Sequence, residues 1–145
     1  MKQYIHRIAA IIATLCIATF FTSSIIVELF GSLNSVTQVK NLIVMPGLFI
    51  LIPAIATTGA TGFALAKDRK SRFVNTKKKR MPIIALNGLL LLLPAAIFLN
   101  QWAASGVFDN RFYLVQTLEL LVGAINLVLM SLNIRDGLKL TTKQD

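Results

Sequence analysis

The chain has 145 residues, of which 55% are hydrophobic and only 14% charged, and its formal net charge is +9. Soluble domains contain about 25% charged residues, so this composition excludes an ordinary soluble domain and is typical of a membrane protein. All basic residues except Lys40 and Arg111 lie in the N-terminus, the central loop and the C-terminal tail. Membrane insertion requires such a distribution. We therefore expect the positive charge to meet a lipid bilayer and not nucleic acid.

Four apolar segments are long enough to cross a bilayer, which takes roughly 20 helical residues. They run from about 8 to 30, 42 to 66, 82 to 104 and 112 to 134, and Pro82 opens the third. The sequence therefore predicts an all-α fold, a single integral membrane domain over residues 1–145 built as a four-transmembrane-helix bundle. A closed β-barrel would need short alternating strands instead of unbroken apolar runs. The stretches 31–41 and 105–111 are expected to be short outer loops.

The first apolar segment has a second interpretation as a signal peptide, because residues 1–7 are basic and an apolar core follows. Its removal would leave three spans and reverse the side of the mature N-terminus. The core continues through residues 25–27 without a small-x-small cleavage site. We therefore expect the segment to be retained as the first span.

Small side chains recur every four residues in the first two spans, and this spacing allows membrane helices to approach closely. The ridge of the first span consists of Ala10, Thr14, Ala18 and Thr22. The second span has two adjacent ridges, one of Ala56, Ala60 and Ala64 and one of Thr58, Gly62 and Ala66. A short loop joins the two spans, so we expect them to pack against each other along these faces.

The central loop, residues 67–80, carries eight positive charges against one negative. Short loops rich in Lys and Arg stay in the cytoplasm, which predicts that both termini are also cytoplasmic, an N-in/C-in orientation. The small size and this charge bias favour the bacterial inner membrane. The end of the loop is also a candidate contact for anionic lipids. The residues of this contact are Lys77, Lys78, Lys79 and Arg80.

A polar stripe follows one face of the fourth span. Its members, spaced by three, four or seven residues, are Gln116, Glu119, Gly123, Asn126 and Asn133, with Met130 between the last two. Residues at this spacing share one helix face. An amide facing lipid would lose its hydrogen bonds, so the stripe must face the bundle interior or another subunit. An ionisable residue inside a span is a functional hypothesis by default, which singles out Glu119.

Candidate partners of the stripe are found at matching depth in other spans. Glu28 lies near the outer end of the first span, Asn87 lies in the third, and Asn100 lies near the outer end of the third. A basic partner for Glu119 would have to be Arg111 or Lys40 reaching in from the edge, and without one Glu119 should be protonated. Three roles for Glu119 remain open: hydrogen-bonded glue between helices, a proton or cation site, and a contact to a partner subunit.

His6 is the one histidine of the chain and lies at the inner boundary of the first span. An interfacial histidine in reach of water is the simpler interpretation. The alternative is a haem b ligand, paired with a methionine such as Met81 or with the His6 of a second copy. Cys16 is single, so no internal disulfide forms. Apart from this haem alternative, no cofactor and no metal site is expected.

Three short motifs carry a resemblance to a known group of proteins. Ile5, His6 and Arg7 stand at the start, residues 45–48 (Met-Pro-Gly-Leu) open the second span, and residues 58–62 (Thr-Gly-Ala-Thr-Gly) close it. The chain resembles small four-span bacterial inner-membrane proteins of unassigned function, which share their layout with copper-resistance D-type membrane domains. Metal or haem roles in such relatives need several histidines, whereas this chain has one.

No P-loop, GxSxG, HExxH or Ser/His/Asp set occurs in the sequence, so enzyme chemistry of the soluble type has no support. The first functional hypothesis is a non-enzymatic membrane protein that acts through helix–helix interaction, as a homo-oligomer or as an accessory subunit of a membrane complex. The alternative is a proton- or cation-coupled carrier or channel centred on Glu119. A second alternative is a haem-binding electron carrier through His6.

Overall fold

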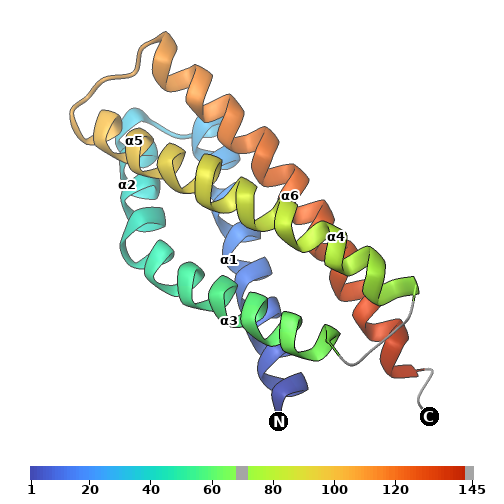
Figure 1. The fold of residues 1–145 in the computed structure, drawn as a ribbon. Helices are drawn as coiled ribbons and strands as arrows, with labels where there is room; N and C mark the ends of the chain where they lie inside the picture. The colour runs from blue at the N-terminus through green and yellow to red at the C-terminus, as the bar shows by residue number, and fades with distance from the viewer. Residues whose placement is uncertain (68–71, 143–145) are drawn as a thin grey trace.

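The computed structural model describes residues 1–67 and 72–142, and the described residues form helices and short connections (Figure 1). Four helical units are long and apolar enough to cross a membrane: Lys2–Phe30, Leu33–Ala66, Val74–Ala104 and Asn110–Lys139. The prediction of an all-α fold with four long apolar helices is thereby confirmed. The first helix begins and the last helix ends at one end of the molecule, called the N/C end, and the turns around residues 31 and 106 lie at the other, the far end. Residues 68–71 of the predicted basic loop lie outside the described residues.

The first unit is the helix α1 (Lys2–Phe30). Ala9, Ala13 and Ile17 recur every four residues and are buried, whereas large apolar side chains such as Leu15 point outward. The buried line consists mostly of small side chains and packs along α3, because small residues let two helices approach closely.

The second unit bends in its middle. It consists of α2 (Leu33–Leu42), a kinked segment η1 (Ile43–Leu48) and α3 (Phe49–Ala66). Met45 leaves the helical region with φ −134° and ψ 112°, as expected for a residue that precedes proline. At this bend a Cβ on Gly47 would lie 2.6 Å from the Phe20 ring and 2.9 Å from the Leu42 carbonyl oxygen. The absent side chain therefore lets α1 pack directly against the bend.

The prediction of a loop over residues 31–41 is wrong for most of its length, because α2 begins at Leu33. The Ser32 hydroxyl accepts a hydrogen bond from the Ser35 amide and caps the helix. Val36 and Lys40, four residues apart, are both buried against the rest of the bundle. Polar residues on the other faces of α2 interrupt the hydrophobic pattern, and that pattern alone suggested a loop.

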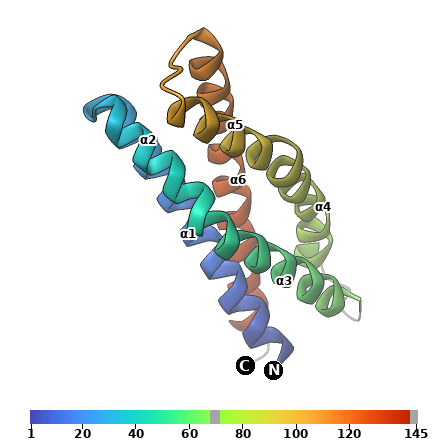
Figure 2. The same ribbon diagram turned by 90° about the vertical axis from the view of Figure 1, so that its left-hand side faces the viewer.

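The third unit also combines three segments: α4 (Arg72–Leu86), a π-helical segment η2 (Asn87–Leu92) and α5 (Leu93–Ala104). Pro82 does not open this unit as predicted, because α4 begins more than two turns earlier. The wider turn of η2 directly precedes Pro94, where a proline nitrogen cannot donate to a regular helix. Figure 2 shows the combined α4–α5 helix bowed away from α3.

The fourth unit, α6 (Asn110–Thr142), is one uninterrupted helix that contacts α1, α4, η2 and α5. The Asp109 carboxylate accepts hydrogen bonds from the backbone amides of Arg111 and Phe112, both at 3.1 Å, and so fixes the start of α6. Gly106, in the turn before it, has a φ of +71°, a conformation that suits glycine.

The apolar core has two parts. The larger one occupies the middle of the bundle and includes Ala13, Ile17, Leu51, Ala96 and Met130. The smaller one closes the far end, where α2, α5 and α6 meet. Its buried members are Val36, Leu99, Ala103 and Phe112.

The predicted ridge of α1 lies beside the line that actually packs. Ala10, Thr14 and Ala18 are half-buried, next to the buried Ala9, Ala13 and Ile17. Thr22 is exposed, so its predicted part in the contact with α3 is wrong. The helix is turned by about one residue from the expected register, because the strictly buried face also has to include Ile17.

The two predicted ridges of α3 differ in their burial. Gly62 is buried, and a Cβ there would lie 2.5 Å from the Met81 Cε and 3.1 Å from the His6 Cε1, so this ridge faces the bundle. Ala56, Ala60 and Ala64 are all exposed. The prediction that Ala64, Ala60 and Ala56 pack against α1 is therefore wrong. The two ridges lie on different faces of one helix, and only the face of Gly62 is turned toward α1 and α4.

Candidate functional site

The polar stripe of α6 faces the bundle interior. Gln116, Asn126 and Asn133 expose 3%, 1% and 8% of their surface, and Gly123 and Met130 between them are also buried. Large apolar side chains such as Leu114, Leu121 and Val128 are exposed on the opposite face of the helix. The stripe therefore finds its surroundings within the chain itself.

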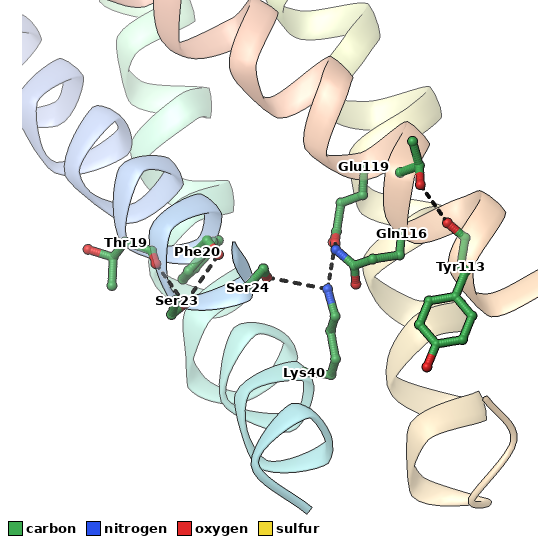
Figure 3. Close-up of polar contacts among 9 residues, drawn as sticks. Thr19, Phe20, Ser23, Ser24, Lys40, Tyr113, Gln116 and Glu119 are labelled. Carbon is green, nitrogen blue, oxygen red and sulfur yellow. Dashed lines mark hydrogen bonds and ion pairs between the residues drawn. The ribbon is translucent and has the colours of Figure 1, made fainter. Parts of the chain in front are cut away.

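The centre of the site is an ion pair between two long-range residues. The Lys40 ammonium of α2 lies 2.6 Å from Glu119 Oε2 of α6, and the lysine side chain is completely buried (Figure 3). Of the two basic partners considered from the sequence, Lys40 occupies the position and Arg111 is exposed. Lys40 is not an edge residue but lies within α2, and this is why its side chain points into the bundle.

Three further polar side chains surround this ion pair: Ser24, Gln116 and Glu28. Together with Lys40 and Glu119, they are called the Lys40 cluster. Ser24 Oγ accepts a hydrogen bond from the Lys40 ammonium at 3.3 Å, and Gln116 Nε2 donates to Glu119 Oε2 at 3.3 Å (Figure 3). Glu28 lies close enough to Lys40 and Glu119 to interact electrostatically with both. The cluster joins α1, α2 and α6.

The Lys40 cluster contains one more acid than base. Two carboxylates, Glu28 and Glu119, face a single ammonium group, so with both acids ionised the cluster has a charge of −1. Two buried oxygen atoms, Glu28 Oε1 and Gln116 Oε1, have no hydrogen-bond donor among the described residues. Buried polar atoms without a partner are rare in proteins. A proton on one carboxylate, or a bound cation, would remove the net charge.

The middle of the stripe is held by an amide pair. Asn87 Nδ2 donates to Asn126 Oδ1 at 3.1 Å, and Asn126 Nδ2 donates to the Ile84 carbonyl at 3.3 Å. The structure thus brings Asn87 to the stripe. Asn100, half-buried on α5, has no hydrogen bond to the stripe within residues 1–67 and 72–142. Asn133 lies further along α6, and its Oδ1 is another buried acceptor without a described donor.

A second charged group lies at the N/C end of the bundle. Asp136 is 3% exposed and accepts a hydrogen bond from Arg80 Nη1 at 2.8 Å. The Arg135 guanidinium lies 3.3 Å from the other carboxylate oxygen. The pair fixes α4 against α6. Arg80 therefore faces inward, whereas Lys78 and Lys79 are exposed and available to a lipid surface.

His6 belongs to this end of the bundle and is buried. Its Nδ1 lies 3.0 Å from the Thr61 hydroxyl and 3.1 Å from the Thr58 carbonyl, and its Nε2 lies 3.1 Å from the Lys77 ammonium. Met81 is also nearby, across Gly62. Both ring nitrogens already have partners within the chain, so a haem iron would have to displace one of them. The contacts of His6 therefore do not favour a haem ligand.

Three site residues were missed or undervalued from the sequence. Asp136 lies two residues beyond the last apolar segment, so hydropathy alone does not mark it as buried. Ser24 was one of several small residues in an apolar run. Lys40 was placed in a loop, although its spacing from Val36 and Ile43 fits a single buried helix face.

Comparison of the chain with models of protein families, with curated proteins and with solved structures found no match. The likeness to small four-span membrane proteins therefore stays a prediction from its short motifs. Function has to be argued from the site itself.

Proposed function

We propose that the chain spans the bacterial inner membrane four times, with both termini and residues 67–80 on the cytoplasmic side. The four long apolar helices support this topology, because their outward faces consist largely of exposed Leu, Ile and Phe side chains. The exposed Lys78 and Lys79 at the N/C end support the orientation.

The topology is tested by reporter fusions in a bacterial host. A fluorescent protein that folds only in the cytoplasm should be active when fused to the C-terminus and inactive when inserted at Gly106. A phosphatase that folds only outside should give the opposite pattern. Activity of the phosphatase at the C-terminus would contradict the proposed orientation.

We also propose that the protein is a proton- or cation-coupled carrier centred on Lys40 and Glu119. The observation that carries this proposal is the fully buried ammonium with two carboxylates around it. Charged groups are costly inside a membrane, and they commonly mark ion and proton pathways. A cluster that holds one unneutralised acid can load and release a proton or a cation as its surroundings change.

Polar groups that continue along α6 support a route through the bundle. From Glu119 to Asp136 the helix rises about 25 Å, at 1.5 Å per residue. Between these two residues lie the Asn87–Asn126 pair and Asn133. Polar side chains therefore recur on the inward face of α6 between the Lys40 cluster and the charged group at the N/C end.

The carrier proposal is tested in vesicles that contain the purified protein and a trapped pH-sensitive dye. A potassium gradient with valinomycin makes the interior negative, and proton entry is followed with and without an opposing sodium gradient. We expect faster pH change than in protein-free vesicles under at least one of these two conditions. Glu119→Gln should lower the rate to the protein-free level, because it removes the charge that a proton or cation neutralises.

The matched control is Thr117→Val, on the exposed face of the same helix. The threonine hydroxyl donates to the Tyr113 carbonyl of its own helix, so this variant should transport like the wild type. A wild-type protein that never exceeds protein-free vesicles would overturn the carrier proposal. Full transport by Glu119→Gln would do the same.

A second candidate function is interaction with another membrane subunit or a second copy of the chain. The exposed ridge of Ala56, Ala60 and Ala64 on α3 supports it, because a neighbouring helix can approach such a surface closely. The polar stripe no longer requires such a partner, since its side chains face inward. Native mass spectrometry on gently extracted protein tests this candidate, and a bare monomer mass would count against it.

A further inference from the structure

An apolar cavity of about 190 Å³ lies in the middle of the bundle, between α1, α3, the α4–α5 helix and α6. Its wall consists of hydrocarbon side chains and two glycines, with two exceptions, Ser24 and Glu119. Both exceptions also contact the Lys40 ammonium. Ser24 and Glu119 therefore belong both to the cavity wall and to the Lys40 cluster, and they form the polar end of the cavity.

The cavity reaches the surface of the molecule between α3 and η2. Ile52 on α3 and Leu89 on η2 both line it, and they are 44% and 56% exposed. The α4–α5 helix is bowed away from α3 along this side (Figure 2). An apolar molecule can thus enter sideways, from the medium that surrounds the helices, without passing either end of the bundle.

The polar end of the cavity offers acceptors and negative charge. Glu119 lines the cavity itself. Glu28 and Gln116 do not line it but belong to the same cluster, and each has a buried oxygen, Oε1, without a donor among the described residues. Gln116 as a whole is only 3% exposed, so water has little access to this oxygen. A ligand that suits this end must bring N–H or O–H donors, and a positive charge would neutralise the extra carboxylate.

We propose that the cavity binds an amphiphilic primary amine, with its ammonium group at Glu119 and its alkyl chain among the apolar side chains of α1, α3 and η2. The inference deepens the carrier function and rests on it for the role of this ligand as cargo. An ammonium group supplies three N–H donors and one positive charge. The alkyl chain fills the apolar part of the cavity and contacts the hydrocarbon side chains of its wall.

Other head groups fit the same site less well. A carboxylate or phosphate head would add a third negative charge beside Glu119 and Glu28, and the Lys40 ammonium beside them already donates to Glu119 and Ser24. An alcohol supplies one donor but no charge, and a quaternary ammonium supplies charge but no donor. This ranking makes the head group the property to vary while the chain length stays constant.

The experiment measures binding of octylamine to the full chain in lipid nanodiscs by titration calorimetry, with empty nanodiscs subtracted. Octyltrimethylammonium, 1-octanol and octanoate are titrated in the same way. We expect octylamine to bind most tightly and octanoate not at all. Glu119→Gln should weaken octylamine binding about tenfold or more, since a charge-assisted hydrogen bond is replaced by a neutral one.

A second pair of variants tests the location of the alkyl chain without touching the ion pair. Ala56 is exposed and lines the mouth of the cavity, whereas Ala60, one turn further along α3, is exposed and does not line it. Ala56→Phe should therefore block octylamine binding, and Ala60→Phe should leave it unchanged. Both substitutions lie on the surface of the helix, so they should fold alike.

Two results would overturn the inference. One is equal binding of octylamine and 1-octanol, which would mean that the cavity only takes up apolar material. The other is octylamine binding that Ala56→Phe and Glu119→Gln both leave unchanged. Because binding is measured at equilibrium without gradients, either result leaves the vesicle test of the carrier proposal independent. If the protein does not transport in vesicles but binds octylamine, the carrier proposal is wrong and the proposed binding site stands.

Discussion

Lys40→Met is expected to lower the free energy of unfolding by about 3–5 kcal/mol, the cost of breaking a buried ion pair by removing one partner. Methionine has a similar length and fills the same space without the charge. Glu119 and Glu28 would then lie in the bundle without a cation, and Ser24 would lose its donor. The change is measured by reversible unfolding in mixed detergent micelles, followed by the helical circular dichroism signal.

The double variant Lys40→Met/Glu119→Gln separates the charge from the packing. It removes both partners of the ion pair and leaves only Glu28 without a cation, so part of the lost stability should return. Lys139→Met is the matched control, because Lys139 is exposed near the end of α6 and should change the stability by less than about 1 kcal/mol. If Lys40→Met unfolds like Lys139→Met, the ion pair does not stabilise the fold.

The fold was predictable from the sequence because hydrophobic length is a strong signal in this chain. Four apolar runs indicated the four helices, and the spacing of Gln116, Glu119, Asn126 and Asn133 indicated one face of the last of them. The ends of the helices were harder to predict. Polar residues inside α2 and basic residues inside α4 continue a helix once neighbouring helices or water satisfy their side chains, and hydropathy does not register this.

The partner of Glu119 shows where sequence reasoning stops. Depth along each span made Lys40 and Arg111 equal candidates, since both lie near the far end. The choice depends on which way each side chain turns, and this follows from the cap at Ser32 and from the burial of Val36 on the same face. The cavity could not be predicted at all, because its wall is made by residues of all four helical units, and hydropathy does not say how closely these units approach one another.

Asp136→Asn should destabilise the N/C end of the bundle, with a loss of about 3 kcal/mol, near the lower limit for a broken buried ion pair. Asparagine has the same shape, so the packing around it is preserved while the negative charge is lost. The Arg80 guanidinium, at 2.8 Å, would then lie beside Lys77 and Arg135 without a described counter-charge. Its side chain is 19% exposed and can turn partly toward water, which keeps the loss below that of Lys40→Met.

The comparison that decides this second prediction is Arg135→Gln. Arg135 also contacts Asp136, at 3.3 Å, but its side chain is 58% exposed. An exposed ion pair contributes at most about 1 kcal/mol, so this variant should unfold close to the wild type. Arg80→Gln, in contrast, should approach the loss of Asp136→Asn, since it leaves the carboxylate buried. Equal and small effects of the three variants would mean that apolar contacts alone hold α4 against α6. The Asp136–Arg80 ion pair would then not stabilise the N/C end of the bundle.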